Sequence, residues 1–215
     1  MPAADVASSL GVADDVWPRF SAHWDDLAPD RYAGELGMRR LRRYGHFRFK
    51  DGVAKPIPIA AFVQPDDSNP LYVEQDRHFE PLTDAFMKDP LLDKLLQLLA
   101  RFAIALDDVP VWTVKVHPFR VIASAHGEGQ PTPEGLHRDG VTLVTSLLIA
   151  RRNAVGGESS VFDLAGRQLL TATLCETGSL LMGDDRRTVH GVSPIRTLDG
   201  SAPALRDVLV ITFAS

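Results

Sequence analysis

The sequence has a single cysteine, Cys175, among its 215 residues. An intrachain disulfide is therefore excluded, and nothing indicates an oxidising compartment. Cys175 follows the apolar TATL, which favours a small buried side chain over a nucleophile. Long apolar runs are also missing: no segment approaches the roughly eighteen apolar residues of a membrane span. The N-terminus lacks the basic start and apolar core of a secretion signal, so we expect a cytoplasmic protein without membrane contact.

Positive charge is not in excess either, since 23 Lys and Arg against 28 Asp and Glu give a net charge of −5. Nucleic-acid-binding proteins concentrate Lys and Arg on one face, whereas the basic clusters RRLRRYGHFRF and ARR are short and mixed with apolar residues. We expect no nucleic-acid partner. A hydrophobic content of 45% is that of an ordinary globular protein. The oligomeric state stays open, and a homodimer is compatible with the sequence.

What the chain does contain is a chelating pair in the stretch PTPEGLHRDG, residues 131–140. In an extended strand the side chains alternate with a period of two, so His137 and Asp139 point to the same side. His190 is the only histidine downstream of this pair. Two histidines and one carboxylate on one face of a metal form the facial triad of non-haem Fe(II) oxygenases. These three residues are therefore our candidate metal ligands.

A candidate anion-binding residue follows the distal histidine. After a short polar loop, the hydrophobic strand RDVLVITF opens with Arg206, which shares a face with Val208 and Val210. We assign this face to the interior, where a planar guanidinium suits the far carboxylate of a dicarboxylate co-substrate. Arg196 is the competitor, but it precedes a loop rather than a hydrophobic strand, so we favour Arg206.

The blocks HRDG, NAVGGES, DDRRTVHGVSPI and RDVLVITF, in this order, resemble the small bacterial 2-oxoglutarate/Fe(II) dioxygenases related to L-isoleucine dioxygenase, which hydroxylate free aliphatic L-amino acids. The resemblance covers roughly residues 112–213 and is thinner upstream, where it rests on AFVQPDDSNP and DRHFEPL. It implies Fe(II) on His137, Asp139 and His190, with 2-oxoglutarate and O₂ as co-substrates and ascorbate as the reductant in vitro. It also implies that Arg206 holds the C5 carboxylate of 2-oxoglutarate.

The implied fold is mainly β with flanking helices around a double-stranded β-helix, a cupin-like jelly roll. We expect a single domain over residues 1–215, in which 1–110 form a helical and strand support region and 111–215 form the metal-binding core. Hydrophobic spacing predicts one or two short helices within residues 3–35 and a main helix after Pro90, preceded by a capping Thr83. Strands are expected at residues 41–49, 57–64 and 111–124.

Three charged residues are candidate substrate contacts. Glu134 precedes His137 by three residues, where an anion could receive a substrate ammonium group. Arg120 could hold a carboxylate by a bidentate contact, although a surface cation is the alternative. Arg77 lies in a long irregular segment, residues 64–81, which the resemblance places near the mouth of the active site. For Arg77, the alternative role is a structural salt bridge.

The roles of Asp184 and Asp185 stay open at this point. Both precede His190 closely, where they could ligate a metal themselves or form the turn and hydrogen-bond the groups around the ligands. The sequence does not choose between these roles for either residue.

The resemblance implies hydroxylation, or sulfoxidation, of a small substrate, with a free aliphatic L-amino acid favoured. Two alternatives remain. A cupin-type enzyme could use the same ligands to hold Zn²⁺ or Mn²⁺ for non-redox chemistry, because these ligands do not select iron by affinity. A non-catalytic jelly roll could bind a small molecule without turnover. The sequence does not identify the amino acid or derivative, nor the position and stereochemistry of oxidation.

Overall fold

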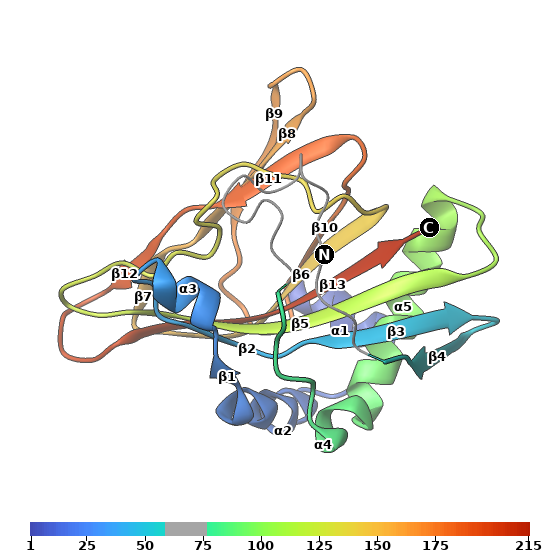
Figure 1. Cartoon of the computed structure of the whole chain (residues 1–215), viewed down its shortest axis with the longest axis horizontal. Coiled ribbons are helices and arrows are strands. Elements are labelled where there is room, and N and C mark those ends of the chain that lie inside the picture. Colours follow the sequence, from blue (N-terminus) through green and yellow to red (C-terminus); the bar gives the residue numbers. More distant parts are fainter. Residues whose placement is uncertain (59–76) are drawn as a thin grey trace.

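The computed structural model describes residues 1–58 and 77–215. Its largest element is an eight-stranded antiparallel sheet with the path β1-β2-β5-β13-β6-β10, extended by β3, which pairs with β5, and by β4, which pairs with β3 (Figure 1). The strands of this sheet are β1 (Ala28–Pro29), β2 (Arg40–Arg42), β3 (Gly45–Lys50), β4 (Val53–Pro56), β5 (Trp112–Ala123), β6 (Leu143–Arg152), β10 (Leu180–Asp184) and β13 (Ala204–Ala214).

Two smaller sheets complete the β structure. One has the order β11-β8-β9 and the other pairs β12 with β7. Their strands are β7 (Ala154–Gly156), β8 (Glu158–Asp163), β9 (Gln168–Thr173), β11 (Thr188–Val192) and β12 (Ile195–Thr197). The sheets are not closed into a barrel. The expectation of a mainly β fold with flanking helices is confirmed.

Helices α1 (Ala3–Leu10), α2 (Val16–Ser21), α4 (Asp84–Met87) and α5 (Pro90–Leu106) cover the outer face of the large sheet (Figure 1). The other two are the 3₁₀ helix η1 (Ala22–Asp26), which directly follows α2, and α3 (Arg31–Glu35). As predicted, Thr83 caps α4 by accepting a hydrogen bond from the Phe86 N–H at 3.2 Å. Asp89 caps α5, and Pro90 occupies its first turn, where a missing N–H costs nothing. No helix in the described part of the chain is long and apolar enough to cross a membrane.

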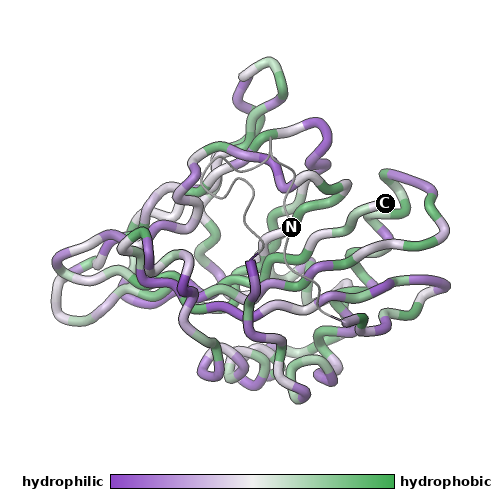
Figure 2. Tube along the Cα trace, viewed as in Figure 1, coloured by the Kyte–Doolittle hydropathy of each residue, from purple (hydrophilic) through white to green (hydrophobic). Residues whose placement is uncertain are grey.

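The two faces of strand β13 border different regions of the molecule, the hydrophobic core on one side and a pocket on the other. Leu209, Ile211 and Phe213 are buried in the cluster that joins the sheet to the helices. The residues that alternate with them line a pocket on the opposite face of the sheet: Arg206, Val208, Val210 and Thr212. Hydrophobic positions accordingly run along both the sheet and the helices beneath it (Figure 2). The alternation in RDVLVITF therefore predicted correctly which residues face the interior of the site.

Asp51 and Gly52 both have positive φ, 51° and 76°, and this tight hairpin turn leads into β4 at Val53, a strand that the sequence analysis did not predict. Most of the strand predicted at 57–64, and residues 64–76 of the predicted irregular segment, lie outside the described residues. One local expectation requires correction. Cys175 was expected to be buried but is exposed. The apolar run ends at the buried Leu174, and the chain then turns, so the next side chain faces solvent.

Candidate metal centre and its pocket

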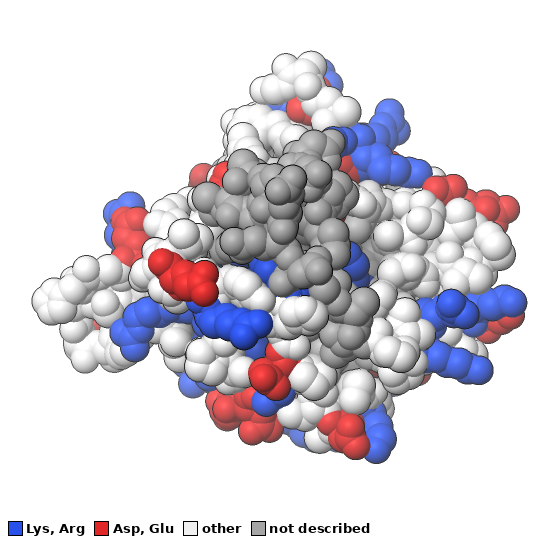
Figure 3. Space-filling model, in the orientation of Figure 1, with Lys and Arg blue, Asp and Glu red and all other residues white. Residues whose placement is uncertain are grey.

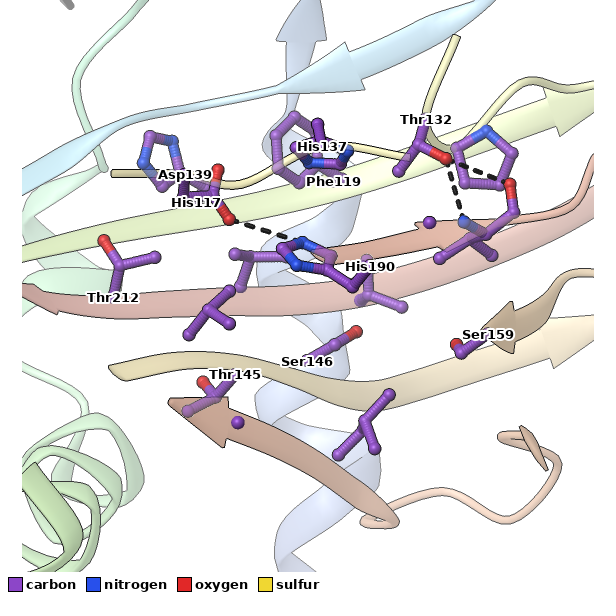
Figure 4. A pocket seen from close by; sticks show the side chains of 18 of the residues that line it. His117, Phe119, Thr132, His137, Asp139, Thr145, Ser146, Ser159, His190 and Thr212 are labelled. Carbon is purple, nitrogen blue, oxygen red and sulfur yellow. Dashed lines mark hydrogen bonds and ion pairs between the residues drawn. The ribbon is translucent and has the colours of Figure 1, made fainter. Parts of the chain in front are cut away.

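The pocket lies between the inner face of the large sheet and strands β8 and β11. Strands β5, β13, β6 and β10 supply one wall, while β8, β11 and the loop at residues 131–139 supply the other. Figure 4 shows the labelled side chains converging on this space from both walls. Figure 3 shows acidic and basic side chains interspersed over the viewed face of the molecule.

His137, Asp139 and His190 come together in this pocket, with one potential ligand atom from each lying within 4.8 Å of the others. The two histidines face each other across an isolated antiparallel bridge, in which the N–H of each donates to the carbonyl of the other at 2.9 Å. His137 and Asp139 thus lie in a loop held by a single bridge, not in the regular strand that we expected. The extended backbone there still puts both side chains on one side.

The orientation of both imidazole rings leaves Nε2 facing the centre. His137 Nδ1 lies 3.0 Å from the Gly135 carbonyl oxygen, so Nδ1–H donates and Nε2 carries the lone pair. His190 Nδ1 lies 3.7 Å from Asp185 Oδ1, and its Nε2 lies 3.5 Å from Asp139 Oδ2 (Figure 4). The Gly135 carbonyl thus fixes the ligating tautomer of His137. The Asp185 carboxylate lies behind the His190 ring without a hydrogen bond to it, and among the described residues His190 Nδ1 has no hydrogen-bond partner.

Asp185 organises the loop that carries Asp139. Its carboxylate accepts hydrogen bonds from three consecutive N–H groups, those of Asp139 (3.1 Å), Gly140 (2.8 Å) and Val141 (3.1 Å). It is also almost fully buried. Asp184 instead forms an ion pair with Arg186 at 3.0 Å, in the turn before β11. The two aspartates therefore differ: Asp185 orients groups around the candidate ligands, and Asp184 stabilises a turn.

The charges of the three candidate ligands are coupled. Burial raises the pKa of Asp139, but the hydrogen bond and positive charge of His190 outweigh it and leave this pKa below its usual value. Burial lowers the pKa of His190, but the carboxylates of Asp139, Asp185 and Glu134 outweigh it and leave the pKa raised. The centre therefore attracts positive charge, as a cation site must.

Arg206 lies in the same pocket as a buried cation. It is 2% exposed, and among the described residues its Nε and Nη2 atoms have no hydrogen-bond partner. Burial, and then the charge of Arg151, lower its pKa to about 10, so it stays protonated at neutral pH. A buried charge is costly unless it is paired. Arg206 is therefore placed to receive an anion, whereas Arg196 already binds Glu128 at 2.7 Å.

The three predicted substrate contacts have different positions. Glu134 lines the pocket, with Oε1 3.6 Å from His137 Nε2. Arg77 also lines it and is buried. Arg120 is outside the pocket lining and makes a bidentate pair with Asp207, two bonds of 2.8 Å. The expectation for Arg120 is therefore corrected: it alternates with pocket-lining Phe119 and Val121, so its side chain leaves from the other face of β5.

The sequence reasoning missed a group of basic residues on the pocket wall formed by β2 and β5. They are Arg40, Arg42, Lys115 and His117. The alternation within β5 already placed Lys115 and His117 on one polar face. Nothing in the sequence indicated that the short strand β2 pairs with β5 and adds two arginines to that face.

A sequence profile of the 2OG-Fe dioxygenases matches residues 21–212. The chain belongs to this family. It is 29% identical over 158 residues to a 3(1)-hydroxy-L-isoleucine 4-dioxygenase from Pantoea ananatis, a match that covers 65% of the chain but only 62% of that protein. It is 26% identical to an L-isoleucine-4-hydroxylase from Bacillus thuringiensis, covering 88% of the chain and 79% of the relative.

Solved structures share the fold of this chain. A BsmA homologue from Methylobium petroleophilum PM1 superposes with a TM-score of 0.89 at 34% identity, over 99% of this chain and 86% of that one. IDO from Bacillus thuringiensis superposes with a TM-score of 0.76 at 19% identity, over 93% and 82% of the two chains. The fold is the double-stranded β-helix of the 2OG-Fe dioxygenases.

The 2OG-Fe dioxygenases use Fe(II), 2-oxoglutarate and O₂, and the donor set in the pocket fits this iron. Two imidazole nitrogens and one carboxylate would hold the iron on one side and would leave coordination positions open for other ligands. The buried cation Arg206 fits the second requirement, an anion-binding group in the same pocket.

Proposed function

We propose that this protein is an Fe(II)- and 2-oxoglutarate-dependent dioxygenase that hydroxylates, or sulfoxidises, a free aliphatic L-amino acid. The observation that carries the proposal is the presence, in one pocket, of the His137, Asp139 and His190 cluster and the buried cation Arg206. One relative is named as a hydroxylase of L-isoleucine and the other as a dioxygenase of 3(1)-hydroxy-L-isoleucine, so L-isoleucine is the first candidate substrate and its 3(1)-hydroxy derivative the second.

Each residue then has a distinct role. His137, Asp139 and His190 hold the iron, and the guanidinium of Arg206 pairs with the C5 carboxylate of 2-oxoglutarate. When bound, the iron with 2-oxoglutarate and O₂ supplies the oxidising power that inserts oxygen into a C–H bond, with succinate and CO₂ as co-products. Glu134, beside His137, receives the substrate ammonium, and Arg77 borders the substrate space. A homodimer is compatible with this arrangement.

Part of the lining suits an aliphatic side chain. Val208 and Val210 project from β13, Leu181 from β10 and Val161 from β8, all into the pocket. Such an apolar patch packs against an aliphatic chain and excludes water from the reacting carbon. This composition favours isoleucine, leucine or methionine over a polar amino acid.

The test measures succinate formed by the protein with Fe(II), ascorbate and 2-oxoglutarate, in the presence of each of the twenty amino acids. We expect succinate to rise with an aliphatic amino acid, and mass spectrometry to show 16 Da added to that amino acid (one oxygen atom). His137→Ala is the negative control, and His126→Ala, in the loop before residue 131, is the matched control.

Other results would select the alternatives. Turnover of an amino acid without 2-oxoglutarate would indicate non-redox metal chemistry. Binding of 2-oxoglutarate or an amino acid without succinate or product would indicate a non-catalytic binding protein. Either result contradicts the proposal.

A further inference from the structure

The buried cation Arg206 has a second cation directly opposite it in the large sheet. In the pairing of β13 with β6, Arg206 lies opposite Arg151. Residues directly opposite each other in an antiparallel pair share a face of the sheet, so both side chains leave it on the side of the pocket. Like charges in this arrangement destabilise a sheet. The pair therefore requires a reason beyond strand pairing.

The two arginine side chains meet over Gly157, the residue that precedes β8. A Cβ atom at Gly157 would lie 3.0 Å from Arg151 Nη1 and 3.3 Å from Arg206 Cδ. Gly157 also has a positive φ of 70°, so glycine is favoured there by the backbone as well as by the lack of space. A side chain at this position would crowd both arginines. The glycine therefore lets the two cations lie close together.

Neither arginine is neutralised by the described part of the chain. Arg206 Nε and Nη2 and Arg151 Nη1 are buried without a hydrogen-bond partner there, and neither guanidinium forms an ion pair with a described carboxylate. Arg151 is anchored by its other terminal nitrogen, Nη2, which donates to the Gly156 carbonyl oxygen at 2.6 Å. The charge of Arg151 also contributes, after burial, to the lowered pKa of Arg206. Two guanidinium charges thus remain uncompensated.

The next residue of β13 shows how the same sheet neutralises a charge within the protein. Asp207 lies opposite Arg120 of β5, and the two form a bidentate ion pair. On the pocket face, by contrast, Arg206 has Val121 on one side and Arg151 on the other. A buried cation is costly without a counter-charge, and a second cation beside it increases that cost. An anion from outside the chain would offset both charges.

We propose that Arg151 is a second cation of the co-substrate site and acts together with Arg206 on the C5 carboxylate of 2-oxoglutarate. This inference rests on the proposed function. Arg206 lines the pocket and contacts the carboxylate, while Arg151, which is outside the described lining, adds positive charge from the neighbouring strand. Arg151 is thus a specificity-determining residue, because its charge favours a 2-oxo acid with a second carboxylate over one without it.

The test compares 2-oxoglutarate with 2-oxopentanoate, which has a methyl group in place of the C5 carboxylate. Isothermal titration calorimetry, with Mn(II) in place of Fe(II), gives the Kd of each acid without turnover. The preference is the Kd for 2-oxopentanoate divided by the Kd for 2-oxoglutarate. We expect Arg151→Gln to lower this preference about 10-fold, because one of two cations near the C5 carboxylate is lost. The Kd for 2-oxopentanoate should stay at the wild-type value.

Arg152→Gln is the matched control. Arg152 follows Arg151 on β6 but is exposed and is not part of the described pocket lining, so its substitution should keep the preference of the wild type. Arg151→Lys keeps the positive charge and should keep most of the preference. If Arg151→Gln does not fold, Arg151→Met against Arg151→Lys supplies the same comparison between a neutral and a charged side chain.

The possible failures are distinguishable. A wild type that prefers 2-oxoglutarate, with the same preference in the neutral variant, overturns the role of Arg151 and leaves the proposed function intact. A preference that falls equally in Arg151→Lys also overturns it, because charge is then not the cause. Equal weakening of both acids does so too, because a packing defect then explains the loss. A wild type that binds both acids equally contradicts the assignment of Arg206 and the proposed function, and the inference with them.

Discussion

The two ends of the pocket are built differently. At the metal end, His137 and Asp139 lie in a loop that makes one bridge to β11 and is held by the Asp185 carboxylate. At the anion end, Arg206 projects from an eleven-residue strand that pairs with β5 on one side and β6 on the other. The first position depends on a few polar contacts, and the second on a continuous hydrogen-bond ladder.

This difference indicates which substitutions should impair metal binding and which should impair anion binding. A strand in the middle of a sheet keeps its side-chain directions even when a neighbouring side chain changes, because the ladder is made by the backbone. A loop keeps its direction only while its N–H groups stay satisfied. Substitutions that remove loop support should therefore impair metal binding, while those on β13 should act through the substituted side chain itself.

The largest effect should come from the ligand set. Asp139→Ala removes the only anionic ligand of the proposed iron site, so we expect Fe(II) to be lost on desalting and succinate formation to fall by more than about 10³-fold. Iron content and succinate are measured together. Asp163→Ala, at the end of β8 and not among the residues that line the pocket, is the control. An Asp139→Ala protein that retains iron and activity would show that the site lies elsewhere.

At the anion end, Arg206→Lys keeps the charge but loses the planar fork. We expect the KM for 2-oxoglutarate to rise about 100-fold, because the co-substrate loses a bidentate contact in a buried site. Arg196→Lys, which alters a surface pair with Glu128, should leave this KM unchanged. Equal effects of the two substitutions would contradict the assignment of Arg206.

Loop support is tested by Asp185→Asn. Because one oxygen becomes an amide group that cannot accept from the N–H groups of Asp139 to Val141, we expect Fe(II) affinity to fall about 10- to 100-fold. Asp184→Asn, on the adjacent turn, is the matched control and should change affinity little. Titration with Fe(II) under anaerobic conditions measures both. Similar Fe(II) affinities for the two variants would contradict the inference that the metal end of the pocket depends on the Asp185 carboxylate.

The smallest effect on activity is expected from Arg120→Ala. This change leaves Asp207, which is 0% exposed, as an uncompensated buried carboxylate, so the free energy of unfolding should fall by about 3 kcal/mol. The KM for the amino acid should stay at the wild-type value. Arg167→Ala, which breaks an exposed pair with Asp163, should cost less than about 1 kcal/mol. A raised KM in Arg120→Ala would restore its predicted role in substrate binding.

Local patterns in the sequence were sufficient for much of the site. The spacing of His137 and Asp139, the single downstream histidine and the alternation around Arg206 all depend on residues close together in the chain, where backbone geometry determines which side chains share a face. The capping Thr83 and the leucines of α5 follow from equally local rules. The fold and the cofactors came from the resemblance of ordered blocks, and the family match supports both.

Only the tertiary structure decided which distant side chains meet. Asp207 pairs with Arg120, and Arg42 with His117, because β5 lies between β13 and β2 in a particular register. A shift of one residue in either register would turn the same side chains to the opposite face. The sequence by itself therefore determined the chemistry available to the site, while strand order and register determined which charges are neutralised in the structure and which face the substrate.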